Sequence, residues 1–121
     1  MKSVGMALAL ALVWTQGVAA EGDAAAGKKV FKKCAACHAI KDGQKKVGPS
    51  MFGVWGRQAG VVEGYKYSKA MDQAGFIWDS DTLAGFLAAP RKHLPGTKMA
   101  FAGLKKPDQI ADVLAYLKSL Q

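Results

Sequence analysis

A dense run of turn-forming residues constrains this sequence more than any other feature. Within residues 40–64 glycine, proline and Asp-Gly recur every few positions, at Asp42-Gly43, Val47-Gly48-Pro49, Gly53, Gly56 and Gly60. Because these residues interrupt regular structure, the stretch predicts long loops with neither a long helix nor a long strand. A domain of about 100 residues buries only about two thirds of its unfolded surface even when it is well packed. Something besides side chains is therefore expected to fill the core.

Helical signals flank this loop-rich stretch at both ends of the chain. A first helix is predicted over residues 23–36, with Asp23 as its N-cap and apolar residues at spacings of three and four. The last helix has the clearest pattern, because Pro107 suits a first helical turn and Asp108 suits the positive helix end. Its apolar positions recur at i, i+3, i+4 and i+7, as Ile110, Val113, Leu114 and Leu117.

Two further helices are predicted between these ends. A short one covers residues 68–74, and a longer one covers residues 80–89, where Ser80 is the expected N-cap and Pro90 prevents continuation. No run of residues alternates as a strand does. The predicted fold class is therefore all-α, with three to five helices and long loops in one domain.

Residues 1–20 have the composition of an export signal. Lys2 precedes an uncharged, mostly apolar run, and Val18-Ala19-Ala20 supplies the small residues that precede a signal-peptidase cut. Cleavage after Ala20 is expected, which leaves residues 21–121 as a periplasmic domain. An uncleaved anchor is the alternative, but a span needs about 20 mostly apolar residues. The run is interrupted near its end by Thr15, Gln16 and Gly17.

Both cysteines lie in one pentapeptide, Cys34-Ala35-Ala36-Cys37-His38, which has the C-x-x-C-H spacing of covalent haem attachment. Two thiols three residues apart can each add to one vinyl group of a porphyrin edge and form thioethers, while His38 lies beneath the iron. One haem c bound through Cys34 and Cys37 would supply the missing core and couple folding to cofactor attachment.

A bare C-x-x-C pair also suits a disulfide or a thioredoxin-like redox site in an oxidising compartment. A thioredoxin-like site needs a strand before its helix and a βαβ frame, and neither is found in the pattern. A structural zinc site would lack its further ligands. The context favours haem.

A haem iron held by one histidine has a sixth coordination position. Outside the leader the methionines are Met51, Met71 and Met99, and the other histidine is His93. Met99 follows a rigid turn at Pro95-Gly96, whereas core methionines usually lie in periodic apolar sequence. Met99 is therefore predicted to be the sixth ligand. His93 is expected to be a surface or core-edge imidazole that stays a weak alternative ligand.

Taken together, these motifs resemble a known family. The sequence is similar to the class I c-type cytochromes, in particular the bacterial cytochromes c2 and c550, over nearly all of residues 21–121. The resemblance rests on motifs in the family's order, namely Cys34-Ala35-Ala36-Cys37-His38, Val47-Gly48-Pro49, Gly56-Arg57, Tyr65-Lys66-Tyr67-Ser68, Trp78 and Pro95-Gly96-Thr97-Lys98-Met99-Ala100-Phe101. It implies a small cytochrome c fold wrapped around one covalent haem.

The resemblance also implies roles for individual residues. It makes His38 and Met99 the axial ligands, with the carbonyl of Pro49 accepting the other ring N–H of His38. An unpaired carboxylate in an apolar pocket is costly, so donors are needed near the haem propionates. The residues that match such positions are Arg57, Tyr67, Trp78 and Thr97.

Other matching positions concern packing. Gly27 and Phe31 match first-helix positions that cross the last helix near Tyr116. Two positions depart from the family's pattern, since Phe86 stands where many relatives carry tyrosine and Met71 near a position where many carry asparagine. Both departures lower the polarity around the iron, so the family's typical reduction potential does not carry over.

The charge pattern supplies the prediction about partners. The formal charge is +8, from 17 basic and 9 acidic residues. Basic residues at the haem-contacting segments would steer acidic docking surfaces of redox proteins, such as a cytochrome bc1-type donor, a terminal oxidase, a reductase or a reaction centre. Ordinary solvation of these lysines is the alternative, and no nucleic-acid-binding motif is present. The predicted docking residues are Lys33, Lys46, Lys92, Lys98 and Lys105.

The sequence therefore predicts a soluble, periplasmic, monomeric one-electron carrier between membrane respiratory or photosynthetic complexes, and not an enzyme. With both axial positions closed, the iron has no position at which to bind a substrate. Two alternatives stay open. One is a membrane-anchored cytochrome c subunit, if residues 1–20 persist, and the other is a haem enzyme or gas-binding protein with a labile Met99 ligand.

Overall fold

The computed structural model describes residues 3–5, 9–12 and 22–121, so the predicted cleavage site after Ala20 lies outside the described residues. Within them the helices are α1 (Ala24–Val30), the 3-10 helix η1 (Phe31–Lys33), α2 (Lys69–Asp72), α3 (Ser80–Ala88), α4 (Pro90–His93) and α5 (Pro107–Ser119). The only β pairing in this part of the chain is a single antiparallel bridge, Gln58 to Ile77. The all-α prediction is confirmed. None of the described helices combines the length and the apolar character that a bilayer crossing requires.

The first helix begins where it was predicted and ends earlier. The carboxylate of Asp23 caps it by accepting hydrogen bonds from two backbone N–H groups of the first turn. The helix ends at Val30 and tightens into η1, where the N–H of Cys34 bonds to the carbonyl of Phe31 at 2.8 Å. The predicted continuation to residue 36 is wrong, because this tighter turn redirects the chain at the C-x-x-C-H pentapeptide.

Helices α3 and α4 meet at Pro90. The N-cap of α3 is Asp79 and not Ser80, because Asp79 and Thr82 form a reciprocal capping box with bonds of 2.9 and 2.8 Å. Pro90 ends α3 after Ala88, as predicted, and also begins α4, which was not predicted. Proline has no N–H and a fixed φ, so it suits the first position of a helix as well as the end of one.

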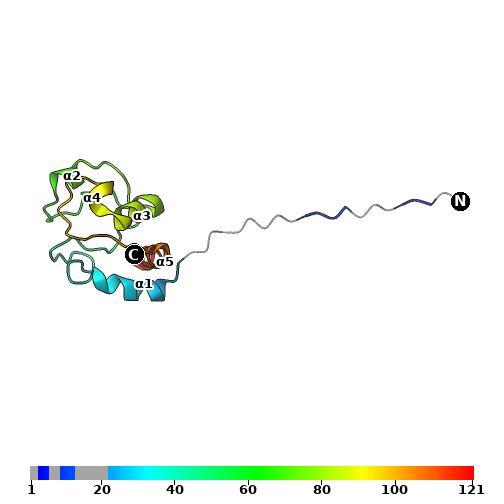
Figure 1. Cartoon of the computed structure of the whole chain (residues 1–121), viewed down its shortest axis with the longest axis horizontal. Coiled ribbons are helices and arrows are strands. Elements are labelled where there is room, and N and C mark those ends of the chain that lie inside the picture. The colour runs from blue at the N-terminus through cyan, green and yellow to red at the C-terminus, as the bar shows by residue number, and fades with distance from the viewer. Residues whose placement is uncertain (1–2, 6–8, 13–21) are drawn as a thin grey trace.

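The crossing of α1 and α5 joins the two ends of the domain (Figure 1). A Cβ on Gly27 would overlap the carbonyl of Asp112 and lie 2.9 Å from the Cβ of Tyr116, so glycine permits this close approach. The ring of Phe31 packs on that of Tyr116, with centroids 5.3 Å apart. The predicted crossing of these two helices is confirmed.

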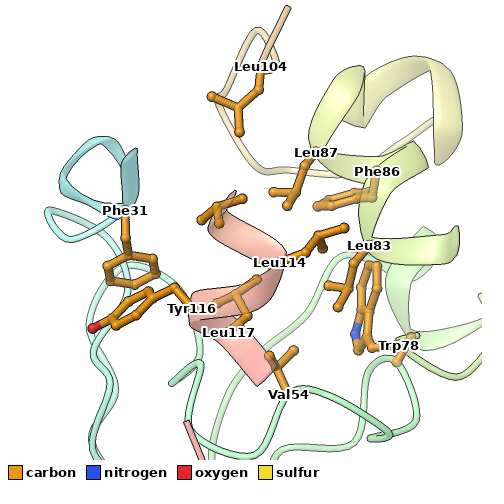
Figure 2. Packing of buried hydrophobic residues seen from close by; sticks show 12 residues of the cluster. Phe31, Val54, Trp78, Leu83, Phe86, Leu87, Leu104, Leu114, Tyr116 and Leu117 are labelled. Carbon is orange, nitrogen blue, oxygen red and sulfur yellow. The ribbon is translucent and has the colours of Figure 1, made fainter. Parts of the chain in front are cut away.

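The hydrophobic core lies between α5, α3 and the loops that precede α3. Figure 2 shows Leu83 and Leu87 of α3 directed towards Leu114 of α5, with Trp78 and Val54 closing one end. Several half-buried side chains pack against this cluster, and two of them, Cys34 and Met99, are predicted site residues. These two residues therefore border the core.

Candidate haem-binding site

The His38 ring is held in one orientation by the segment that follows the loop of residues 41–47. Its Nδ1 lies 2.8 Å from the carbonyl oxygen of Pro49. The N–H of Gly48 bonds to the carbonyl of Cys37 at 2.7 Å, and a Cβ on Gly48 would lie 2.7 Å from Nδ1 of His38. Because Nδ1 donates to a carbonyl, Nε2 is left as the ring atom with a free lone pair.

Burial also sets the charge of this ring. Desolvation lowers the pKa of His38, and nearby Arg57 lowers it further, while the bond to Pro49 opposes them. The imidazole is therefore neutral at neutral pH. A neutral imidazole is the form that binds a metal ion.

The two cysteines lie on one turn, with no disulfide between them. The N–H groups of Cys37 and His38 both bond to the carbonyl of Cys34, at 3.0 and 2.9 Å. Burial raises the pKa of the Cys34 thiol, and neighbouring Cys37 adds to this effect. Two free thiols beside a neutral imidazole are the donor set that covalent haem attachment needs.

Met99 is half-buried on the loop between α4 and α5. This loop turns at Gly96, which has φ +92°, and the N–H of Thr97 bonds to the carbonyl of Leu94 at 3.1 Å. Met51 and Met71 are also half-buried against the core, so burial alone does not distinguish Met99 from them. Met71 lies in α2, whereas Met51 and Met99 both lie outside the described helices, so place in the fold separates Met99 from Met71 but not from Met51.

The ring of His93 lies at the edge of the core, as the sequence predicted. It packs edge-on against Phe76 and Phe86, with centroids 5.9 and 6.3 Å away. The residue is exposed. It therefore covers the outer edge of an aromatic cluster that includes the buried ring of Phe86.

Arg57, Tyr67 and Trp78 form a second group of donors. The N–H of Trp78 bonds to the carbonyl of Arg57 at 2.8 Å, which places the two residues on paired segments. The Arg57 guanidinium donates to the carbonyls of Ser50 and Phe52 at 3.1–3.2 Å. Burial lowers the pKa of Arg57, and Tyr67 beside it has the opposite effect.

No carboxylate among the described residues pairs with this half-buried guanidinium, whose hydrogen-bond acceptors are carbonyl oxygens. A desolvated cation without an acidic partner suits an anionic group brought by a cofactor, and haem carries two propionates. Thr97 lies apart from this group along the chain, and its Oγ1 accepts a 3.5 Å bond from the N–H of Met99.

Sequence reasoning missed the contacts that join the two sides of the site. The Lys98 ammonium donates to the carbonyl of Lys66 and lies 4.7 Å from the ring centroid of Tyr65. The Tyr65 hydroxyl donates to the carbonyl of Val47 at 2.9 Å. These contacts connect the Met99 loop to the segment that holds His38. The Tyr65-Lys66 pair was visible within the family motif, but its partners were not.

The predicted docking lysines lie in different surroundings. Lys33 and Lys92 are exposed, and no hydrogen-bond partner of their side chains is found among the described residues. The ammonium groups of Lys46 and Lys105 donate to the carbonyls of Ala35 and Ala102, at 3.0 and 3.1 Å. A cleft of about 480 Å³ between α4 and the Met99 loop is lined by Arg91, Lys92 and Phe101, among others.

Comparison with known proteins covers the whole domain. The family model "Cytochrome c" matches residues 24–121. A cytochrome c from Gibberella zeae is 52% identical over 101 residues, which are 82% of this chain and 95% of that protein. A cytochrome c2 from Agrobacterium tumefaciens is 50% identical over 101 residues, covering 80% and 91%.

Among solved structures, cytochrome cH from Methylobacterium extorquens matches with a TM-score of 0.77 and 45% identity, over 81% of this chain and 99% of that one. Sequence similarity and fold similarity therefore point to the same family. The chain belongs to the cytochrome c family, whose members carry covalent haem c and act as electron carriers.

Proposed function

We propose that this chain is an exported, soluble one-electron carrier, with its haem c attached to Cys34 and Cys37 and with His38 and Met99 as axial ligands. The observation that supports this most directly is the 2.8 Å contact between His38 Nδ1 and the carbonyl of Pro49. It fixes the tautomer in which Nε2 is free for a metal ion.

Haem supplies an iron that alternates between Fe(III) and Fe(II), and the side chains around it decide what else the site does. The thioether of Met99 is a soft ligand that favours the reduced state. Phe86 and Met71 add apolar surface in place of polar groups, which disfavours the more highly charged oxidised state. Closing both axial positions leaves none for a substrate, so the chain carries electrons and is not an enzyme.

The donors around the site are proposed to hold the haem propionates. Arg57 and Tyr67 lie together, Trp78 is joined to Arg57 through the backbone, and Thr97 serves from the Met99 loop. A charge-assisted bond from Arg57 would offset the desolvation of one carboxylate. Replacing Arg57 by methionine removes that bond, so we expect the pH dependence of the reduction potential to change.

The site itself is tested by carbon monoxide. The reduced native protein should bind this gas slowly, because the Met99 sulfur must leave first. The Met99→Ala variant should bind it quickly, and the Met51→Ala variant should behave as the native protein does. Fast binding by the native protein would favour a gas-binding or enzymatic haem site instead.

As a monomer, this chain is proposed to dock on acidic surfaces of redox proteins, such as a cytochrome bc1-type donor, a terminal oxidase, a reductase or a reaction centre. The docking residues are Lys33, Lys46, Lys92, Lys98 and Lys105, which are all exposed. Such steering raises the encounter rate more than the affinity and weakens with salt. Stopped-flow mixing with a partner captured from the periplasm should show a rate that falls as the salt concentration rises.

Export is proposed through cleavage of residues 1–20 after Ala20, which leaves residues 21–121. The family match begins at residue 24 and α1 at Ala24, so the leader precedes the conserved fold. N-terminal sequencing of the purified protein should begin at Glu21. An intact leader on a membrane-bound protein would support the anchored subunit.

A further inference from the structure

We propose that Lys45 and Lys46 are positioning residues for the His38 ring. Their ammonium groups fasten the loop that leads into Gly48 and Pro49, and those two residues hold the ring. The inference rests on the proposed function, because it takes His38 to be an axial ligand.

The two lysines are consecutive, and each reaches a different neighbour. The Nζ atom of Lys46 donates to the carbonyl of Ala35, inside the C-x-x-C-H pentapeptide, at 3.0 Å. The Nζ atom of Lys45 donates to the carbonyl of Gly64 at 3.1 Å. The loop is therefore fastened on one side to the haem-attachment turn and on the other to the loop that follows Glu63.

Polar contacts, and not apolar packing, hold this loop in place; besides the two lysines, the Tyr65 hydroxyl donates to the carbonyl of Val47 at 2.9 Å and the Ser50 hydroxyl donates to the carbonyl of Lys41 at 2.7 Å. Residues 41–47 are all exposed, and Val47 is 74% exposed. A cleft of about 400 Å³ lies between the loop and the rest of the domain, and is lined by Gln44, Lys45 and Arg57, among others. Because apolar packing is absent at this loop, its few polar contacts set its position.

The loop ends at the two residues that touch the ring. Pro49 accepts from His38 Nδ1 at 2.8 Å, and a Cβ on Gly48 would lie 2.7 Å from that nitrogen, so there is no free space between them. A hydrogen bond that weakens at Nδ1 makes the imidazole a poorer donor at Nε2. A poorer donor stabilises the oxidised iron less, and the reduction potential rises.

The test compares lysines that share a loop and a charge. Lys45→Met and Lys46→Met each remove one ammonium group and keep the length of the side chain. Lys41→Met makes the same change in charge on the same loop, and no partner of the Lys41 side chain is found among the described residues. Lys46→Arg keeps the charge and a donor.

Two readouts are needed on the haem-loaded protein. The first is hydrogen exchange of the Gly48 N–H, which bonds to Cys37 at 2.7 Å, and the second is the reduction potential. In Lys45→Met and Lys46→Met we expect exchange to be about fivefold faster and the potential to be higher than in Lys41→Met, because the weakened bond at Nδ1 opposes the fall that loss of a positive charge causes. Lys41→Met should leave exchange unchanged and lower the potential by the effect of charge alone, and Lys46→Arg should show the native behaviour.

Two outcomes would overturn the proposal. One is an equal fall in potential for Lys41→Met and Lys46→Met, which would mean that only the loss of a positive charge is felt. The other is native exchange at Gly48 in the Lys45→Met/Lys46→Met double variant. Neither result touches the proposed function, which instead fails if the spectrum of the native protein shows no His38 coordination.

Discussion

Replacing Gly27 by alanine sets two opposing effects against each other. In an isolated helix the change stabilises by about 1 kcal/mol, because alanine has the higher helix propensity. In α1 the new Cβ would overlap the carbonyl of Asp112 and crowd the Cβ of Tyr116 at 2.9 Å. The overlapping atom is backbone and cannot rotate away, so α1 must move off α5.

The magnitude follows from what that movement breaks. Overpacking at a tight contact costs about 1–3 kcal/mol. Displacing α1 also loosens the ring contact between Phe31 and Tyr116, now at 5.3 Å, and such aromatic pairs contribute about 0.5–1.5 kcal/mol. After the gain in propensity, we expect the free energy of unfolding to fall by about 2 kcal/mol.

Guanidinium unfolding of the haem-loaded protein, followed by circular dichroism, measures this change. Lys28→Ala is the matched control, because Lys28 is exposed on the same helix. It should alter stability by less than about 0.5 kcal/mol. A Gly27→Ala variant that is more stable than the native protein would show that propensity outweighs the contact, and would refute the reasoning.

Three other changes test separate parts of the structure. Gly48→Ala should displace the His38 ring and shift its NMR signals, since the new Cβ would lie 2.7 Å from Nδ1; unchanged signals would contradict this close contact between Gly48 and His38. Asp79→Ala should destabilise α3 where Ser80→Ala does not. Hydrogen bonds from Thr82 lower the pKa of Asp79, so the stabilisation that this cap gives to α3 is complete above the ordinary carboxyl pKa of about 3.9 and is lost as the pH falls through the lowered pKa. Equal urea midpoints for the two variants at pH 7 would contradict this role of Asp79. Tyr65→Phe removes a 2.9 Å hydrogen bond to a neighbouring loop and should lower the free energy of unfolding in urea by about 0.5–1 kcal/mol. An unchanged free energy of unfolding would show that this bond does not stabilise the fold.

The helices show which local signals suffice. α5 was predicted closely, because Pro107 and a periodic apolar face agree with its burial against α1. At the start of α3, Asp79 and Ser80 both have side chains that can cap a helix. Asp79 is the N-cap because it forms a reciprocal capping box with Thr82. The sequence pattern does not predict α4, because a proline at position 90 indicates the end of one helix as readily as the start of another.

The candidate site likewise has residues that the sequence predicts and contacts that it does not. Its chemistry-bearing residues could be named from C-x-x-C-H spacing and from the loop around Met99, because short motifs carry them. The acceptors of Arg57, which are the carbonyls of Ser50 and Phe52, could not be predicted, because carbonyl positions depend on how loops fold over one another. The partners of Lys46 escaped prediction for the same reason.

The identity of the sulfur ligand is the central claim, and methionine labelling tests it most directly. Three of the five methionines lie in residues 21–121, namely Met51, Met71 and Met99, so ¹³C-methyl labelling of the reduced protein gives a small set of resonances. One methyl signal should be shifted far from the others by the haem ring current, and it should vanish in Met99→Ala and persist in Met51→Ala and Met71→Ala. A shifted signal that survives in Met99→Ala, or no shifted signal in the native protein, would contradict the account.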